Sequence, residues 1–151
     1  METLTLQTVI DRIAIEEVRH RYAQALDTQN WEALPPLFTA QVSTDFSDFG
    51  MPPQTVPQEA FIASFRQNLS RPGLRTQHVF SSFRIVVTGD TATSVSNFVG
   101  HHFLPGFEGG EEFTLRGEYT DTLVRTAQGW QMSGVACKLF FMTGNPNLLA
   151  G

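Results

Sequence analysis

The sequence predicts a single α+β domain in which helices come first and an antiparallel sheet follows. In the first half of the chain, apolar residues recur at the spacing of an amphipathic helix. From Arg75 onward the pattern changes to long segments rich in Val, Thr and Phe, which are typical of strands. A length of 151 residues, with 41% hydrophobic and 17% charged residues, fits one globular domain over 1–151.

The first element is a helix from about Gln7 to Gln29, because apolar residues return every three or four positions while charged residues take much of the rest. Asn30 is expected to cap a second, short helix that Trp31 opens. Pro35 and Pro36 shorten it, since neither has an N–H to donate. The expected apolar face of the first helix consists of Ile10, Ile13, Ala14, Val18, Tyr22, Ala25 and Leu26.

The segment between the short second helix and the long strands is expected to contain a strand, a loop and a helix. Val42 to Phe46 is expected to form a short strand, and residues 50–57 are expected to form a loop because they hold one glycine and three prolines. Pro57 then suits the first position of a third helix. The apolar face of that helix is predicted to be Phe61, Ile62, Phe65 and Leu69.

Four long strands are expected over residues 76–88, 91–104, 112–125 and 130–141. A Gly89-Asp90 turn joins the first two, and Ala127-Gln128-Gly129 joins the last two. Strands of about 12 residues in so small a domain must twist and curve. A curved sheet that helices close over leaves a concave interior, which is a natural place for a ligand.

Charge and composition exclude several classes of protein. A net charge of -5 argues against nucleic acid as a partner, because phosphate binding needs clustered Lys and Arg. A single cysteine, Cys137, excludes an intramolecular disulfide and a thiolate metal cluster. The N-terminal segment lacks the apolar core of a signal peptide, and no long apolar run spans a membrane. We therefore expect a soluble, cytoplasmic protein without a membrane partner.

The aromatic composition is uneven, with 13 Phe against two Tyr and two Trp. So many apolar rings in a short chain belong in a dense core, at an interface or in a ligand pocket.

Four polar residues are candidates for a site. Asp27 lies beside the apolar stripe near the end of the first helix, where it is either a solvated or capping residue or a functional one. His78, near a strand start, is either structural or catalytic. His101 and His102 are adjacent and point to opposite faces of a strand, so the pattern does not decide which one faces inward.

Two further acidic positions have open interpretations. Asp121 shares a mostly apolar strand face, which predicts a pocket wall, a sheet edge, an ion pair with an arginine, or an exposed strand at a subunit interface. Glu16 and His20 are four residues apart on the first helix, which favours a surface pair. No histidine spacing predicts a metal site.

A resemblance to a known family is carried by the segment Tyr22–Asp27 (YAQALD) with Asn30-Trp31 and Leu34 after it. These residues resemble the opening helix of SnoaL-like proteins in the nuclear-transport-factor-2-like superfamily. The turn at residues 89–92 and Gly129-Trp130 resemble the same pattern, so the resemblance covers about residues 7–145. It implies a cone-shaped α+β barrel with a cystatin-like fold, in which a strongly bent antiparallel sheet wraps a pocket and packs against N-terminal helices.

Within the superfamily, Leu74–His78 (LRTQH) is similar to the segment that carries the base histidine of scytalone dehydratase. Asp27 stands where the helix aspartate of that enzyme falls, and His101 stands near its second histidine. Asp121 lies near the position of its pocket asparagine. Two departures, Leu26 and Phe46, stand where that enzyme has tyrosines that hold a water near the substrate carbonyl.

The resemblance implies a cofactor-independent dehydratase, a lyase acting on a small cyclic or aromatic hydroxy-ketone or polyketide. His78 is expected to be the general base, since histidine titrates near neutral pH. His101, oriented by Asp27, is expected to hold the substrate or the enolate oxygen, and no metal or cofactor takes part. The expected substrate-binding residues are Tyr22, Phe46, Phe49, Phe65, Phe80, Asn97, Phe98, Tyr119, Asp121 and Phe140.

Two other functions stay open, because one fold can host many activities. An isomerase of the ketosteroid type or a polyketide cyclase would use a carboxylate base, Asp121 or Asp27. The third is a non-catalytic small-molecule-binding or assembly subunit. For each, a small apolar or aromatic ligand and a homo-oligomer, dimer or trimer, through the outer sheet face are expected.

Overall fold

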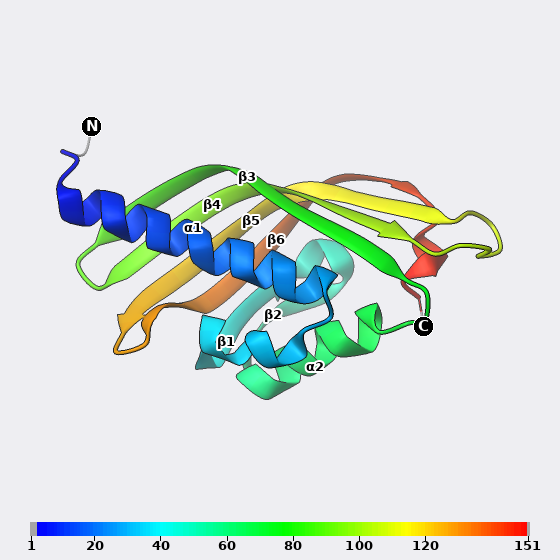
Figure 1. Ribbon diagram of the computed structural model, residues 1–151, viewed down its shortest axis with the longest axis horizontal. Coiled ribbons are helices and arrows are strands. Elements are labelled where there is room, and N and C mark those ends of the chain that lie inside the picture. Colours follow the sequence, from blue (N-terminus) through cyan, green and yellow to red (C-terminus); the bar gives the residue numbers. More distant parts are fainter. Residues whose placement is uncertain (1–2, 151) are drawn as a thin grey trace.

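The computed structural model describes residues 3–150 and has an N-terminal helix laid across a curved six-stranded sheet (Figure 1). Short 3-10 turns cover Trp31–Ala33, Pro35–Leu37, Ser47–Phe49 and Pro146–Leu148. The helices and strands are α1 (Leu6–Asp27), β1 (Phe38–Phe46), β2 (Met51–Pro57), α2 (Gln58–Leu69), β3 (Arg75–Thr88), β4 (Thr91–Phe103), β5 (Glu112–Thr126) and β6 (Gly129–Gly144). The α+β prediction is confirmed.

The strand order is β2-β1-β6-β5-β4-β3, and the two outer strands do not pair with each other, so the sheet is curved and open. All neighbours are antiparallel except β1 and β6, which are parallel. The expectation of a wholly antiparallel sheet is therefore corrected at one pair. After β2 the chain passes through α2 to the far edge and returns strand by strand, which brings β6 alongside β1 in the same direction (Figure 1).

Thr5 is the N-cap of α1, and its hydroxyl accepts a hydrogen bond from the backbone N–H of Thr8 at 3.1 Å. The inner face of α1 differs from the predicted one, because Ile10 and Ile13 are 49% and 65% exposed. At about 100° per residue, Ile13 points roughly opposite to the buried Ile15.

Two charged residues take inner positions of α1 in place of the predicted isoleucines. Asp11 is buried and receives two hydrogen bonds from Arg125, at 2.7 and 2.9 Å, and one from the indole N–H of Trp130 at 3.1 Å. Arg19 is buried against Asp121. A helical pattern that counts only apolar residues misses such positions, since each charge enters the core with its partner.

The prediction of a loop over residues 50–57 is wrong, because Met51–Pro57 forms β2 and pairs with β1. Proline has no N–H for a ladder, and β2 lies at the sheet edge, where proline is tolerated. Pro57 is the N-cap of α2 and not its first residue, and the Asn30 side chain makes no capping hydrogen bond.

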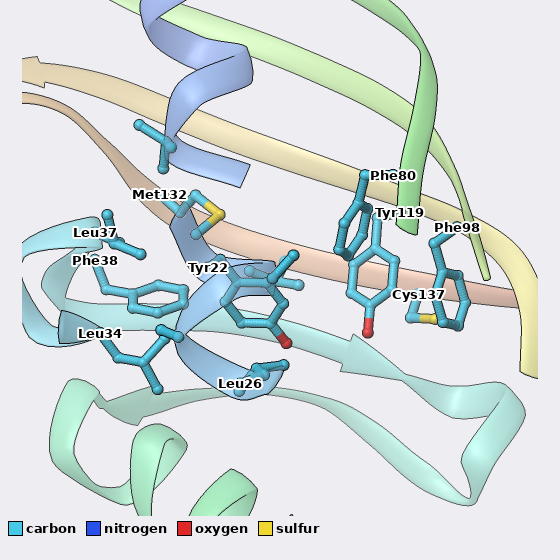
Figure 2. Packing of buried hydrophobic residues seen from close by; sticks show 14 of the residues in the cluster. Tyr22, Leu26, Leu34, Leu37, Phe38, Phe80, Phe98, Tyr119, Met132 and Cys137 are labelled. Atoms are coloured by element: carbon cyan, nitrogen blue, oxygen red, sulfur yellow. The ribbon is translucent and has the colours of Figure 1, made fainter. Parts of the chain in front are cut away.

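The core lies between the concave face of the sheet and the helices. Figure 2 shows Tyr22 from α1 beside Phe38 and Leu34, with Phe80, Tyr119 and Phe98 in a row along the sheet. Most neighbouring rings meet edge to face, for example Tyr22 and Phe38 at 6.2 Å between centroids, whereas Phe80 and Phe98 are stacked at 6.1 Å. Such contacts hold aromatic side chains in fixed positions.

Candidate active site

Asp27, the last residue of α1, contacts His78, the fourth residue of β3. The carboxylate Oδ1 of Asp27 lies 2.7 Å from Nδ1 of the imidazole. The backbone N–H of His78 also donates to Oδ2 at 2.9 Å, and the Thr76 hydroxyl donates to Oδ1 at 2.9 Å. The end of α1 and the start of β3 therefore hold the carboxylate by three separate donors.

This contact defines which nitrogen of His78 is free to react. A carboxylate only accepts hydrogen bonds, so in the neutral imidazole Nδ1 carries the proton and Nε2 has the bare lone pair. The side chains of His78 and Asp27 are 11% and 23% exposed, so both are mostly withdrawn from water. An imidazole with Nε2 bare and Nδ1 paired with a carboxylate can take a proton, and the resulting imidazolium is stabilised.

His102, and not His101, is the second histidine of the site. It is buried, and its ring meets the ring of His78 edge to face at 5.6 Å between centroids. Its Nδ1 lies 3.1 Å from the Phe113 carbonyl, which only accepts, so Nε2 is again the bare nitrogen. Burial, together with the neighbouring His78, lowers the pKa of His102 to about 4 and keeps it neutral near pH 7.

The placement expected for His101 is wrong, since its side chain is exposed and lies 3.3 Å from the Thr114 hydroxyl. Adjacent strand residues point to opposite faces, and His102 shares the buried face with Phe98. The shared face with Phe98 favours His102 as the inward histidine, but Val95 and Val99 make the face of His101 apolar as well, so the sequence alone does not decide.

A cavity of about 280 Å³ lies beside the two histidines, between the curved sheet and α2. Most of its wall is apolar. The predicted residues on this wall are Phe46, Phe49, Phe65, His78, Phe98 and Tyr119. His102, which the sequence left open against His101, also lies on this wall. The sequence reasoning missed Thr44, Met51, Gln54, Val56, Ala60, Phe61, Ser64, Asn68 and Leu115.

The other predicted binding residues lie elsewhere. Tyr22 and Phe80 are buried in the core and are not among the residues of the cavity wall. Asn97 is exposed and Phe140 is 53% exposed, because each takes the outward position of its strand. Asp121 is buried but does not reach the wall, since it pairs with Arg19.

The Arg19–Asp121 pair crosses from α1 to β5. Nε of Arg19 donates to Oδ2 of Asp121 at 3.0 Å, and Nη2 donates to Oδ1. Burial raises the pKa of Asp121, and the attraction of Arg19 opposes that rise. Arg19 donates to both oxygens of this carboxylate. Of the four interpretations of Asp121 that the sequence left open, the structure therefore shows the ion pair with an arginine.

Two glycines give Phe98 its position on the cavity wall. A Cβ on Gly100 would lie 3.3 Å from the Phe98 ring, 3.4 Å from His102 and 3.7 Å from His78. A Cβ on Gly117 would lie 3.2 Å from the other side of the ring. Because neither glycine has a side chain, the ring of Phe98 can lie close to the backbone of β4 at Gly100 and of β5 at Gly117.

Within residues 3–150, no group of three His, Cys, Asp or Glu side chains is arranged to hold a metal ion. Among the same residues, no helix is both long and apolar enough to cross a membrane.

An open curved sheet, a covering helix and an Asp–His pair at an apolar cavity define a class of α+β proteins with an internal pocket. The SnoaL-like domain matches residues 7–136, and the chain therefore belongs to the SnoaL-like domain family. Its structural neighbours include proteins of the nuclear-transport-factor-2-like superfamily with a cystatin-like fold. No curated protein sequence matches it.

Three solved structures illustrate the similarity. The Kfla4162 protein from Kribbella flavida is 29% identical, with a TM-score of 0.87 over 95% of this chain and 99% of that one. A Novosphingobium aromaticivorans protein, named scytalone dehydratase by inference, is 21% identical, with a TM-score of 0.79 over 94% and 92%. A type 2 hexachlorocyclohexane dehydrochlorinase is 17% identical, with a TM-score of 0.76 over 93% and 92%.

Proposed function

We propose that the protein is a cofactor-independent dehydratase that removes water from a small cyclic or aromatic β-hydroxy ketone. The observation that carries this proposal is the Asp27–His78 pair, which leaves a bare Nε2 on a histidine of an apolar cavity. A base in such a place can attack a C–H bond made acidic by a neighbouring carbonyl.

The reaction is a β-elimination in two proton transfers. Nε2 of His78 takes the proton from the carbon beside the carbonyl, and the electron pair of that bond forms an enolate. The enolate collapses, the bond from the β-carbon to the hydroxyl breaks, and the leaving oxygen takes the proton back from His78. The products are an unsaturated ketone and one water molecule.

Each neighbour of His78 has a role in this scheme. Asp27 fixes the tautomer and stabilises the imidazolium between the two transfers. His102 is neutral with Nε2 bare, so it accepts a hydrogen bond from the substrate hydroxyl and does not donate one. The phenylalanines of the cavity wall exclude water and favour a flat ligand.

The names of two structural neighbours support elimination chemistry without establishing it here. One is named for a dehydratase and one for a dehydrochlorinase, and both names describe loss of a small molecule across a carbon–carbon bond. An isomerase or cyclase with Asp121 as its base is disfavoured, because Arg19 engages both oxygens of that carboxylate.

The test is ultraviolet turnover of a panel of cyclic β-hydroxy ketones by wild type and His78→Asn. Asparagine keeps a donor near the place of Nδ1 and removes Nε2. Loss of general base catalysis is expected to lower turnover by about 10²- to 10⁴-fold. His101→Asn is the matched control and should keep the wild-type rate, whereas equal rates in wild type and His78→Asn would refute the base. Substrate isomerised without loss of water would favour the isomerase, and saturable binding without turnover would favour the binder.

A further inference from the structure

Three buried polar atoms in the middle of the core make no hydrogen bond to any residue from 3 to 150. They are Nη1 of Arg19, Oγ of Ser94 and Oγ of Ser96. The three residues are 1%, 2% and 0% exposed, so bulk solvent does not reach them. A buried donor or acceptor that stays unpaired keeps its full cost of desolvation, and native proteins therefore pair nearly all such groups. Three of them in one region indicate a common partner that is not part of the chain.

The two serines lie on the part of the sheet that Arg19 covers. In the antiparallel pair of β4 and β5, Ser94 stands opposite Asp121 and Ser96 stands opposite Tyr119. Residues that are directly opposite hold their Cβ atoms about 5 Å apart on the same face of a sheet. Arg19 contacts both of these partners, because Nε donates to Oδ2 of Asp121 at 3.0 Å and the guanidinium carbon lies 4.6 Å from the ring centroid of Tyr119. Each serine is therefore next to a residue against which the guanidinium rests.

The strand on the other side of β4 has a bulge at the same level. Between its paired residues Ser81 and Arg84, β3 has two residues where β4 has only Ser96. A bulge of this kind bends the strand and interrupts the ladder. Ser82, inside the bulge, has a φ of 55°, which is uncommon for a residue other than glycine. Ser96 thus has no single residue directly opposite it on β3, and the sheet is least regular where the unpaired hydroxyls lie.

The chemistry of the three atoms favours water over an ion or an organic ligand. Nη1 of Arg19 only donates, whereas each serine hydroxyl can donate or accept. A water molecule can accept from Nη1 and exchange one hydrogen bond with each hydroxyl. The charge of Arg19 is already balanced by Asp121, whose carboxylate would repel an anion. None of the three residues is among those of the cavity wall beside His78, so a substrate in that cavity does not reach them.

We propose that Arg19, Ser94 and Ser96 bind one internal water molecule that is a fixed part of the fold. Its oxygen accepts from Nη1 of Arg19, and its other hydrogen bonds go to the two hydroxyls. Three hydrogen bonds are the usual number for a buried water. The water links α1 to β4, beside the direct ion pair between α1 and β5. This site is independent of the proposed dehydratase, because it lies outside the cavity.

Urea unfolding of Ser96→Ala tests the proposal by the sign of the change. If the hydroxyl bonds the water, alanine removes a hydrogen bond and the urea midpoint falls by about 0.5 M; an unpaired hydroxyl would instead be relieved, and the midpoint would rise. Ser94→Ala is expected to fall in the same way. Ser81→Ala, at an exposed position of β3, is the matched control for replacing serine by alanine in a strand. A rise in both buried variants relative to this control would overturn the proposal.

A crystal structure of the wild-type chain tests the site directly and does not depend on how any variant folds. We expect an electron-density peak about 2.7–3.2 Å from Nη1 of Arg19 and from the Oγ of Ser94 and Ser96. Crystals grown in sodium bromide separate water from an anion, because bromide gives an anomalous signal and water does not. An anomalous peak at this position would overturn the proposal, and so would a structure in which protein atoms bond all three groups.

Discussion

Asp27 holds His78 through both its ring and its backbone: Oδ1 lies 2.7 Å from the imidazole Nδ1, and Oδ2 accepts from the backbone N–H at 2.9 Å. The carboxylate thus fixes the position of the strand and the tautomer of the ring at the same time. Because α1 ends at Asp27 and β3 begins at Arg75, the helix end and the strand start are joined at the candidate base.

Asp27→Asn is expected to lower turnover far more than it lowers stability. An amide can donate to Nδ1 and so favours the wrong tautomer, which moves the bare nitrogen away from the substrate. A fall in kcat of about 10²- to 10⁴-fold is expected, measured together with the melting temperature. Thr76→Val removes one of the three donors to the same carboxylate and should cost much less activity. If both variants lose activity equally, the tautomer argument fails.

His102 should make stability depend on pH between 6.5 and about 4. Its pKa is lowered by burial from 6.5 to about 4, so across this window the unfolded chain takes up a proton that the folded chain does not. The free energy of unfolding therefore falls as the pH falls, by up to about 3 kcal/mol for this group. Urea unfolding at several pH values should show a weaker dependence for His102→Asn than for wild type.

The exposed neighbour His101 supplies the control for that measurement. His101→Asn should leave the pH dependence of unfolding as it is in wild type, because this side chain is exposed. An identical pH dependence in wild type and His102→Asn would show that His102 titrates normally in the folded protein.

The buried Arg19–Asp121 pair should behave as a unit. Arg19→Met or Asp121→Leu alone leaves one buried charge without its partner, and a loss of about 3–5 kcal/mol is expected from chemical unfolding. The double variant should be more stable than the sum of the two losses predicts, because it leaves neither charge. Arg84→Gln, which breaks an exposed pair with Glu118, should cost no more than about 1 kcal/mol. Additive losses in the double variant would contradict the coupling.

Alanine substitutions at Gly100 and Gly117 are expected to differ: the first should lower activity, and the second should lower the stability of the fold. Gly100→Ala places a methyl group 3.3 Å from Phe98 and 3.4 Å from His102, so these rings must shift and activity should fall while the melting temperature changes little. Gly117→Ala instead places it against the backbone oxygen of Lys138, which cannot move without breaking the β5–β6 ladder. Thermal unfolding and turnover of both variants test this, and a Gly100→Ala enzyme with wild-type activity would contradict it.

Much of the fold could be predicted from the sequence because local patterns determine it. The strands from Arg75 onward are long and have clear turns, so each observed boundary lies within a few residues of the predicted one. β2 could not be predicted in the same way. Its prolines indicate a loop locally, and only its pairing with β1 at the sheet edge makes it a strand.

Several residues of the candidate site could be predicted from the sequence, but the direction in which each side chain points could not. Asp27 was expected to orient His101, and that partner is wrong, because Asp27 pairs with His78. The catalytic roles of these residues stay predictions. The choice of His102 over His101 depends on which strand face meets the core, and adjacent histidines look alike in sequence. Arg19 was missed because a charged residue on a helix indicates solvent unless its buried partner is known.

The prolines of β2 also affect how the protein meets other copies of itself. An edge strand normally offers a row of donors and acceptors on which a foreign strand can add, and this is a route to aggregation. Pro52, Pro53 and Pro57 have no N–H to offer, so the β2 edge is a poor template for such growth. The prolines that led to the prediction of a loop thus protect the β2 edge of the sheet from uncontrolled addition of further strands.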